Sequence, residues 1–321
     1  MKVLITGCAG FIGFHLSNLL ISKKIDVIGL DNLNSYYDVN LKKNRLKILK
    51  QNKKFFFYKE DILNEKKLNN IVKKNKIKII IHLAAQAGVR YSIEDPKTYL
   101  KNNLEGFFNV LEAAKLNKIK HLVFASTSSV YGDNFNFPLK ESESTSRPLS
   151  FYAATKKSNE VMAHSYSYIY KLPCTALRFF TVYGPYGRPD MALFKFTKNI
   201  LENKKIELYN NGRHQRDFTY IDDIVNGIYS IINKPKNNKI PFNVFNIGNG
   251  NSRKLSDYLF LIEKKLGKKA KIKNLPLQKG DIIKTHADIK LLRNFSNYKS
   301  EIDIEKGVSS FIDWFIEYYN Y

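Results

Sequence analysis

Cysteine is scarce in this sequence, which holds only two among its 321 residues, Cys8 and Cys174. Because two cysteines so far apart form neither a disulfide framework nor a paired-cysteine metal site, we expect a cytoplasmic protein. The six histidines are scattered without the short spacings that metal ligands show. The sequence therefore predicts chemistry that needs neither a metal nor a disulfide.

Long hydrophobic runs are also missing. No stretch approaches the length of about 18 apolar residues that marks a membrane-spanning helix. The first apolar run, at 3–5, is too short for the apolar region of a signal peptide. We expect a protein that is neither secreted nor embedded in a membrane.

Acidic residues are few, at 29 against 53 lysines and arginines, which gives a formal net charge of +24. Such an excess can indicate a nucleic-acid or acidic-membrane partner. Here the lysines are spread through every segment and form no arm or block, as on solvated helix faces. We expect no nucleic-acid partner, and a nucleic-acid-binding protein remains an alternative that depends on charge alone.

Apolar runs alternate with helical patterns along the first half of the chain. The runs typical of strands lie at 2–6, 26–31, 54–58, 77–83, 119–126 and 173–180. The helical patterns lie at 11–20, 40–50, 64–74, 97–117 and 150–171. This alternation predicts an α/β fold with a doubly wound, Rossmann-like parallel sheet that is covered by helices on both faces.

The pattern changes after the sixth strand, where the turn residues at 184–189 mark the beginning of a second lobe. Strands are then predicted at 206–209, 216–220 and 242–247, with helices at 191–203, 221–233, 255–266 and 303–318. We expect a sheet domain at 1–180, rejoined by parts of 221–250. We expect 181–321 to form a smaller, mixed α+β substrate lobe.

Gly7, Gly10 and Gly13 fall in the turn between the first strand and the first helix. Glycines there allow a tight turn, a close approach of the backbone to a pyrophosphate and close packing of the helix on the strand. Asp31 ends the second strand, where a carboxylate accepts hydrogen bonds from the adenosine ribose and repels a 2′-phosphate. The sheet domain is therefore predicted to bind NAD rather than NADP.

Tyr152 and Lys156 stand four residues apart on a predicted helix and so share one face. A phenol is a poor base at neutral pH, but a nearby ammonium and a cationic nicotinamide favour its phenolate. Hydroxyl donors are offered at 126–129, at the carboxyl end of the fifth strand. The spacing alone also fits a solvated helix face, and the hydroxyl run alone fits a Ser/Thr turn.

Four segments spread along the sequence resemble the extended short-chain dehydrogenase/reductase family, and the resemblance covers essentially the whole chain. They are Gly7–Gly13, Leu83–Ala87, Tyr152–Lys156 and Arg216–Asp223. Within that family, Asp31–Asp38 and Arg178–Ala192 are most similar to UDP-glucuronate 4-epimerases. The resemblance implies an NAD-dependent nucleotide-sugar epimerase.

The resemblance also assigns roles to individual positions. It implies that the catalytic residues are Thr127, Tyr152 and Lys156. The cofactor-binding residues that it implies are Gly7, Gly10, Phe11, Ile12, Gly13, Asp31, Asn32, Asp61, Ile62, Leu83, Ala84, Ala85, Gln86, Asn103, Tyr152 and Lys156. Around the sugar carboxylate it places Ser128, Ser129 and Thr181, and around the nucleotide diphosphate and ribose it places Arg188, Arg216 and Asp281.

The implied reaction is 4-epimerisation of a UDP-hexuronic acid, UDP-glucuronate to UDP-galacturonate, through a transient 4-keto intermediate. Related dehydratases and decarboxylases carry an acid just after the active-site threonine, where this chain has Ser128 and Ser129. The alternatives are a UDP-glucose or UDP-N-acetylhexosamine 4-epimerase and a non-catalytic NAD-binding regulator. The resemblance also implies a homodimer formed through the helices near 97–117 and 150–171.

Overall fold

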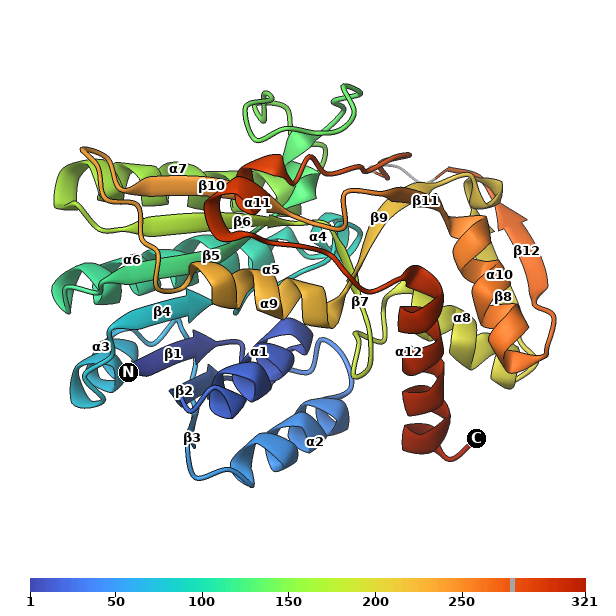
Figure 1. Ribbon diagram of the computed structural model, residues 1–321, viewed down its shortest axis with the longest axis horizontal. Helices are drawn as coiled ribbons and strands as arrows, with labels where there is room; N and C mark the ends of the chain where they lie inside the picture. The colour runs from blue at the N-terminus through green and yellow to red at the C-terminus, as the bar shows by residue number, and fades with distance from the viewer. Residues whose placement is uncertain (278–280) are drawn as a thin grey trace.

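The computed structural model describes residues 1–277 and 281–321 and is built on a seven-stranded parallel sheet (Figure 1). Its strands, in spatial order, are β10 (Phe242–Ile247), β6 (Cys174–Phe179), β5 (His121–Thr127), β4 (Ile79–His82), β1 (Lys2–Thr6), β2 (Asp26–Asp31) and β3 (Phe55–Lys59). The order reverses between β1 and β4, and ligands of such sheets bind beyond the carboxyl ends of the strands at this reversal. The predicted doubly wound sheet is confirmed.

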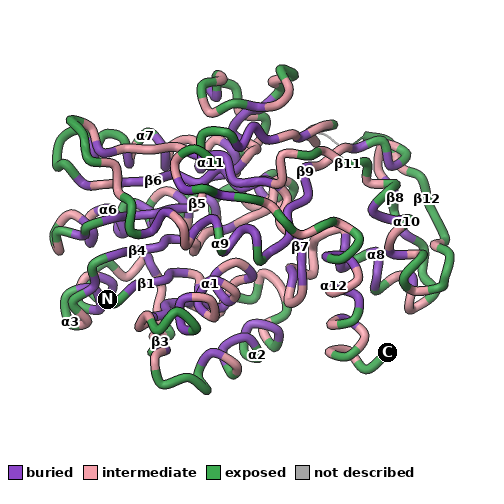
Figure 2. The backbone as a smooth tube through the Cα atoms, in the orientation of Figure 1, coloured by how far each residue is buried: buried purple, intermediate pink, exposed green. Residues whose placement is uncertain are grey.

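Helices cover both faces of this sheet. One face carries α1 (Phe11–Ser22), α2 (Val39–Lys50) and α9 (Ile221–Ile231), and the other carries α3 (Glu65–Lys74), α6 (Gly106–Leu116) and α7 (Phe151–Tyr170). Alternate strand residues pack into opposite cores, as Val3 and Ile5 do on one face and Leu4 on the other. Figure 2 shows the strands buried between the two helical layers. Because both faces are buried, these strands appear in the sequence as continuous apolar runs.

Helix α7 lies against the carboxyl end of the sheet and carries the predicted tyrosine–lysine pair. The Ser150 side chain caps its first turn by accepting a hydrogen bond from the Ala153 N–H at 3.1 Å, and Lys171 ends the helix in a left-handed conformation. Its buried face includes Lys156 and Glu160 as well as small residues. A polar buried face of this kind requires specific partners on the sheet.

The helix predicted at 97–117 is interrupted. The structure has a short helix, α5 (Pro96–Tyr99), then a π-helical segment, η1 (Leu100–Glu105), and then α6. The wider π turn contains the buried Asn103, whose side chain bonds to groups on two other segments. Such turns often occur at functional sites, and periodicity alone does not distinguish them from an α-helix.

Outside the large sheet, the described residues form two small sheets that pack with three of the later helices. The strands are β7 (Thr181–Tyr183), β9 (Gln215–Tyr220) and β11 (Ser252–Lys254) in one sheet and β8 (Lys205–Tyr209) and β12 (Lys271–Leu275) in the other. The helices are α8 (Ala192–Leu201), α10 (Leu255–Leu266) and α12 (Ile304–Tyr319). Figure 1 shows that α8, α10 and α12 lie at the end of the molecule toward which the strands of the large sheet point. The predicted second lobe therefore adjoins the carboxyl edge of the sheet.

Several short elements were not predicted. They are α4 (Tyr91–Glu94), the 3-10 turns η2 (Ser128–Tyr131) and η3 (Asn210–Gly212), β7, β11, β12 and α11 (Lys290–Ser296). None exceeds seven residues, which is too short for a hydrophobic period to show. The 242–247 segment was predicted correctly as a strand, and the structure pairs it with β6 at the edge of the large sheet.

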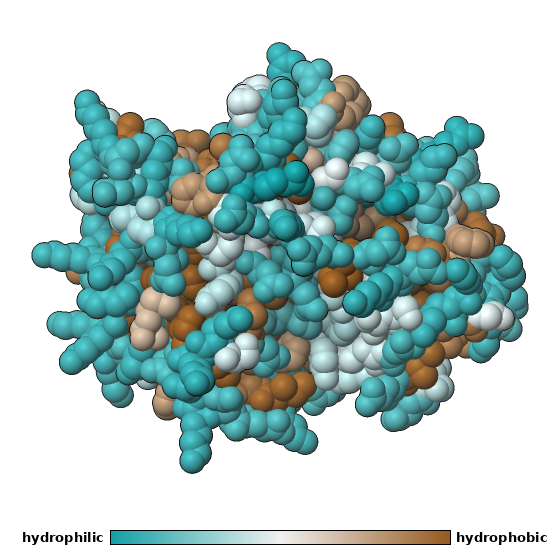
Figure 3. All heavy atoms as spheres, in the orientation of Figure 1, coloured by the Kyte–Doolittle hydropathy of each residue, from teal (hydrophilic) through white to brown (hydrophobic). Residues whose placement is uncertain are grey.

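The surface is mainly hydrophilic on the face that Figure 3 shows, with apolar residues scattered among charged ones. Within residues 1–277 and 281–321, no helix has both the length and the apolar character needed to cross a bilayer. The lysines predicted for solvated helix faces include Lys43, Lys47 and Lys50 of α2. The distributed charge thus lies on an ordinary polar surface.

Asp217 of β9 joins three segments of the second lobe although it is completely buried. Its Oδ1 accepts hydrogen bonds from the N–H of Asn249 at 2.7 Å and from the hydroxyl of Thr219 at 3.3 Å. Its Oδ2 accepts the N–H groups of Gly250 and Ala287, both at 3.0 Å. Burial raises the pKa of this carboxyl, and the backbone donors oppose that rise. Four donors thus satisfy one buried carboxylate.

Replacing Asp217 with Asn is expected to lower the free energy of unfolding by about 2–4 kcal/mol. An amide places an NH₂ group where two backbone donors, those of Gly250 and Ala287, now bond to an oxygen. Urea denaturation at equal NAD content measures the effect, with Asp313→Asn on the surface of α12 as control. A loss below about 1 kcal/mol, similar to that of a surface substitution, would contradict this role for Asp217.

Candidate active site

The turn between β1 and α1 can be built only with glycine at two of its positions. Gly7 has φ +73°, and a Cβ there would lie 2.7 Å from the backbone nitrogen of Ala84. A Cβ on Gly13 would lie 2.1 Å from the Gly7 carbonyl oxygen. Gly10 begins α1, and among the described residues no side chain caps that helix end. Uncapped N–H groups at a helix N-terminus suit a pyrophosphate, so the turn fits the predicted cofactor.

The next two predicted cofactor residues, Phe11 and Ile12, form the first turn of α1. Phe11 is buried in the core, and Ile12 packs against the same core while remaining partly exposed. Their side chains therefore anchor the helix whose N-terminus faces the glycine turn. They would contact a dinucleotide only through the backbone.

Asp31 ends β2 beside this turn and is nine-tenths buried. Its Oδ2 accepts the N–H of Ala9 at 3.0 Å and its Oδ1 accepts the N–H of Leu33 at 2.8 Å. Burial raises the pKa of Asp31, while the Leu33 hydrogen bond and the charge of Lys42 lower it. Each carboxylate oxygen can accept a further bond, so the geometry leaves room for ribose hydroxyls.

Asn32 and Asp61 meet at the carboxyl ends of β2 and β3. The Asn32 amide donates to Asp61 Oδ2 at 2.8 Å, and the N–H of Leu63 donates to Asp61 Oδ1 at 2.9 Å. Ile62 is buried, and its side chain fills the space beside Gly106, where a Cβ would come within 2.5 Å of Ile62 Cδ1. Asn32, Asp61 and Ile62, three of the predicted cofactor-binding residues, thus lie together. The resemblance matches Asp61 and Ile62 to the pair that contacts the adenine.

Asn103 joins the loop after β4 to helix α7. Its Oδ1 accepts the Gln86 N–H at 2.8 Å, and its Nδ2 donates to the Gln86 carbonyl at 3.0 Å and to the Thr155 hydroxyl at 3.1 Å. Thr155 in turn donates to the backbone carbonyl of Tyr152 at 2.8 Å. The same loop begins with three partly buried residues, Leu83, Ala84 and Ala85. The loop that holds the predicted cofactor-binding residues Leu83–Gln86 is therefore fixed directly to the helix that carries Tyr152.

Thr127 and Tyr152 are in contact. The Thr127 hydroxyl, at the end of β5, donates to Ser129 Oγ at 3.2 Å and accepts the Ser129 N–H at 3.2 Å. Burial raises the pKa of Tyr152, whereas its hydrogen bond with Thr127 and the charge of Arg188 lower it. The phenol therefore has a hydroxyl partner and a cation beside it, but burial still disfavours its ionised form.

Lys156 lies one turn further along α7 and is almost completely buried. Burial lowers its pKa to about 8, and the negative charge of Glu160 opposes that shift. His82 at the end of β4 has its pKa lowered to about 3 by burial and by the charge of Lys156, so it is neutral at pH 7. The site thus holds a lysine whose charge titrates close to neutral pH.

The three hydroxyls predicted to face a sugar carboxylate leave the sheet at neighbouring strand ends. Ser128 and Ser129 form the turn that follows β5. Thr127 is the register partner of Phe179 in β6, and Thr181 begins β7 two residues later. All three hydroxyl-bearing residues are partly exposed. They therefore lie along the carboxyl edge of the sheet, near Thr127.

Arg216 and Asp281, both expected near the diphosphate, interact with each other. Burial lowers the pKa of Arg216 to about 10, while the charge of Asp281 raises it and the charge of Arg90 lowers it further. Arg90 also forms an ion pair with Asp281 at 3.2 Å. The sequence did not indicate Arg90, which lies 126 residues before Arg216 and has no local motif.

Arg188 was expected in the same group, and the structure gives it different partners. Its Nε lies 3.0 Å and its Nη2 2.5 Å from the carboxylate oxygens of Asp190. Its charge acts on Tyr152 and on Tyr36. Arg188 is therefore placed beside the tyrosine, while Arg216 and Asp281 form a separate cluster with Arg90.

Sequence reasoning also missed a set of aromatic rings that leads to Tyr152. The Tyr99 ring centre lies 6.0 Å from that of Tyr152 and 6.1 Å from that of Tyr91. Tyr91 packs on Tyr36 at 5.0 Å. Tyr99 is fully buried and donates to the carbonyls of residues 87 and 88. Tyr36 lies in the Asp31–Asp38 segment that carries the resemblance, but in a chain with 20 tyrosines no sequence signal marks Tyr91 or Tyr99.

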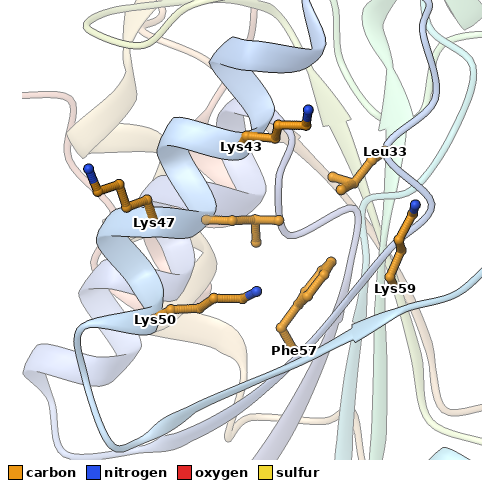
Figure 4. Close-up of a pocket in the computed structure, with 7 residues that line it drawn as sticks. Leu33, Lys43, Lys47, Lys50, Phe57 and Lys59 are labelled. Atoms are coloured by element: carbon orange, nitrogen blue, oxygen red, sulfur yellow. The ribbon is translucent and has the colours of Figure 1, made fainter.

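A groove of about 670 Å³ lies between α2 and the edge strand β3 (Figure 4), and it adjoins Asp31 through Leu33, whose N–H bonds to that carboxylate. It is lined by Leu33, Lys43, Leu46, Lys47, Lys50, Phe57 and Lys59. The Lys50 ammonium lies 4.9 Å from the centre of the Phe57 ring. In the part of the chain that the structure describes, no cluster of His, Cys, Asp and Glu side chains could hold a metal ion. The polar and charged side chains of the candidate site lie at the carboxyl edge of the sheet.

Comparison with known proteins agrees with this geometry. The chain is 48% identical to the protein CapI of Staphylococcus aureus over 99% of both chains. It is 44% identical to a probable UDP-glucuronate 4-epimerase of Rhizobium meliloti, over 99% of this chain and 98% of that protein. The crystal structure of UDP-glucuronic acid 4-epimerase from Bacillus cereus in complex with UDP-glucuronic acid and NAD superposes with a TM-score of 0.93 at 36% identity, covering 99% of this chain and 100% of that one.

A family model agrees with these relatives. The model described as the NAD dependent epimerase/dehydratase family matches residues 3–248, which is most of the chain. The matched range begins in β1 and ends after β10, so it includes every strand of the large sheet. The extended short-chain dehydrogenase/reductase resemblance is thereby confirmed, and the chain belongs to the NAD dependent epimerase/dehydratase family.

Proposed function

We propose that this protein is a UDP-glucuronate 4-epimerase, which interconverts UDP-glucuronate and UDP-galacturonate with bound NAD. The observation that carries the proposal is the contact of Thr127 with Tyr152, one turn before the buried Lys156, at the carboxyl edge of a sheet whose first turn suits a pyrophosphate. Relatives that are named for this activity and similar over nearly the whole chain support it.

The cofactor site follows the elements already described. The glycine turn and the start of α1 would hold the pyrophosphate, Asp31 the adenosine ribose, and Asp61 with Ile62 the adenine. Lys156 would bond to the nicotinamide ribose. Bound NAD supplies a hydride acceptor that later returns the hydride, together with a positive charge on its nicotinamide ring. Because the redox change cancels, NAD is expected to remain bound between turnovers.

Tyr152 acts as the base in this proposal. Its phenolate removes the proton from the hydroxyl on carbon 4, and the Thr127 hydroxyl bonds to the same oxygen. Since burial raises the pKa of Tyr152, the positive charges of Lys156 and Arg188 and of the cofactor are needed to favour the phenolate. The 4-keto sugar then turns its other face to the same residues, and Tyr152 returns the proton. Carbon 4 is inverted as a result.

The carboxylate of a hexuronate requires donors, because a buried charge without partners is costly. Ser128, Ser129 and Thr181 offer hydroxyls at the edge of the sheet without adding an acid. The 4-keto intermediate is a β-keto acid, which loses carbon dioxide when its carboxyl group aligns with the ketone. Donors that hold the carboxylate still would therefore protect the intermediate until carbon 4 is reduced again.

The cytoplasm is the compartment that we propose. Both cysteines, Cys8 and Cys174, are buried and free. Burial raises the pKa of the Cys174 thiol to about 12, so it is unreactive at neutral pH. A structure that uses no disulfide among its described residues is compatible with a reducing compartment.

We also propose a homodimer that forms through η1, α6 and α7. Several large apolar side chains on these elements are exposed, namely Leu100, Phe108, Leu116, Phe151, Val161 and Ile169. Apolar residues gathered on two neighbouring helices are typical of a protein–protein contact. A second copy of the chain that presents the same two helices would bury them by twofold symmetry.

Tyr152→Phe is expected to keep the fold and the bound NAD but to lower kcat by about 10²–10⁴-fold, because only the basic oxygen is removed. Turnover is measured by separating UDP-glucuronate from UDP-galacturonate after incubation without added NAD. Tyr168→Phe on the exposed face of the same helix is the matched control and should leave kcat unchanged. Near-normal turnover by Tyr152→Phe would eliminate the proposed base.

Thr181→Val is expected to lower kcat/KM for UDP-glucuronate by the equivalent of about 1–3 kcal/mol, because the carboxylate loses a donor in a site of the same shape. UDP-glucose, assayed with the same variant, should be affected much less. The measurement is the ratio of the two specificity constants in wild type and variant. UDP-4-keto-pentose, the side product that forms when the 4-keto intermediate loses carbon dioxide, is measured in the same samples. A wild type that prefers UDP-glucose, or a ratio that does not change, would favour a UDP-glucose or UDP-N-acetylhexosamine 4-epimerase instead.

Val161→Glu combined with Ile169→Lys is expected to convert the dimer to a monomer, because charges are then placed in an apolar contact. Analytical ultracentrifugation measures the change in mass. Phe260→Glu, which alters an equally exposed apolar residue on α10, is the control and should stay dimeric. A wild-type protein that sediments as a monomer at micromolar concentration would contradict the proposed dimer.

A further inference from the structure

Glu160 carries a buried carboxylate one helical turn beyond Lys156. Its Oε1 and Oε2 each lie 2.8 Å from Arg178, at Nε and Nη2, and both side chains are more than nine-tenths buried. The Ser126 hydroxyl also donates to Oε1 at 2.7 Å. A bidentate arginine–carboxylate pair of this kind fixes the relative orientation of the two side chains as well as the distance between them. Glu160 is thus rigidly held at a point that the proposed mechanism does not use.

The partners of Glu160 come from the strands that end at the active site. Ser126 directly precedes Thr127 in β5, and Ser126 and Arg178 are register partners across β5 and β6. Glu160 therefore fastens the end of β5 to α7, which carries Tyr152 and Lys156. A single carboxylate links the elements that hold the three proposed catalytic residues.

The network continues away from the site. Arg178 Nη1 donates to the Tyr131 hydroxyl at 3.0 Å, and that hydroxyl donates to Asn246 Oδ1 at 2.6 Å. Asn246 in β10 is fully buried and donates to the carbonyls of Leu139 and Asp288. Since hydrophobic residues of similar volume stabilise a core at least as well as a buried ion pair does, stability alone does not explain this arrangement.

We propose that Glu160 is a positioning residue for the epimerase reaction. It fastens the end of β5 to α7, which fixes Thr127 opposite Tyr152, and it places a carboxylate one helical turn from Lys156. This inference rests on the proposed roles of those three residues. The Glu160 carboxylate bonds to Arg178 and Ser126 and also forms a longer ion pair, of 3.4 Å, with Lys157. It therefore acts through Lys156 and takes no proton from the sugar.

The charged and titratable groups around Lys156 determine whether Glu160 raises or lowers the pKa of that lysine. On α7 these groups are Tyr152, Lys157 and Glu160, and from β4 comes the neutral His82. Arg178 on β6 and Lys157 on α7 both partly neutralise Glu160. Burial lowers the pKa of Lys156 to about 8, and Glu160 raises it. As the pH increases through that value Lys156 loses its charge, so activity should fall on the alkaline side.

The test compares two variants of the NAD-loaded enzyme. Glu160→Gln removes the negative charge and keeps the size of the side chain. The pH at which kcat falls on the alkaline side of its pH profile should therefore decrease by about half a unit or more. Arg178→Lys keeps the positive charge but loses the bidentate contact with Glu160. The maximal kcat should therefore fall, while the pH at which kcat declines on the alkaline side stays the same. Epimer separation at saturating UDP-glucuronate between pH 6 and pH 10 provides both profiles, and bound NAD is measured in each sample.

An alkaline fall in kcat at the same pH in wild type and Glu160→Gln, at equal NAD content, would overturn the proposal, as would equal shifts in both variants. Should Glu160→Gln fail to fold, Ser126→Ala decides the question. It leaves the ion pair intact and removes the bond from β5, so kcat should fall about five-fold with NAD retained; an unchanged kcat overturns the proposal. Activity that survives in Tyr152→Phe would instead refute the proposed catalytic roles, independently of Glu160.

Discussion

The docking of helix α7 on the sheet is the constraint on which the rest of the site depends. Buried polar contacts hold the helix on two sides: Asn103 bonds to Thr155 and accepts a bond from Asn159 through its carbonyl, while Glu160 bonds to Arg178. Buried polar groups are costly when they are unpaired, so a shift of α7 along its axis would break several of these bonds at once. The orientation of the helix is therefore determined more narrowly than apolar packing alone would allow.

Burial of the tyrosine–lysine pair has opposite effects on its two members. It raises the pKa of Tyr152 and lowers that of Lys156 to about 8, so in both cases it disfavours the charged form that the chemistry requires. The surrounding charges counteract burial: Arg188 acts on the tyrosine and Glu160 on the lysine. These charges oppose burial only in part, because the pKa of Tyr152 stays above its usual value. In the proposed mechanism the positive charge of the bound cofactor therefore has to supply the rest.

Local signals in the sequence predicted much of this structure. The glycine turn, Asp31, the Tyr152–Lys156 spacing and the strands of the large sheet follow from periodicity and short motifs, and the structure has them within about two residues. The contacts that local signals miss are long-range. Arg178 meets Glu160 only because β6 returns beside β5, and Arg90 meets Asp281 across 191 positions. The roles of individual site residues, and the boundary between the two lobes, stay predictions.

Strand β7 connects substrate selection to the position of the second lobe. It begins with Thr181, directly after β6, and pairs with β9, whose Arg216 and Asp217 lie beside the Asp281 cluster and at the centre of the lobe. A hydroxyl proposed for the sugar carboxylate and a guanidinium proposed for the nucleotide diphosphate thus lie in two paired strands. Their separation is fixed by backbone hydrogen bonds, whereas the hexose between them needs freedom to turn over. Firm binding at the nucleotide end is compatible with that rotation, because binding energy gained there does not depend on which face of the sugar meets Tyr152.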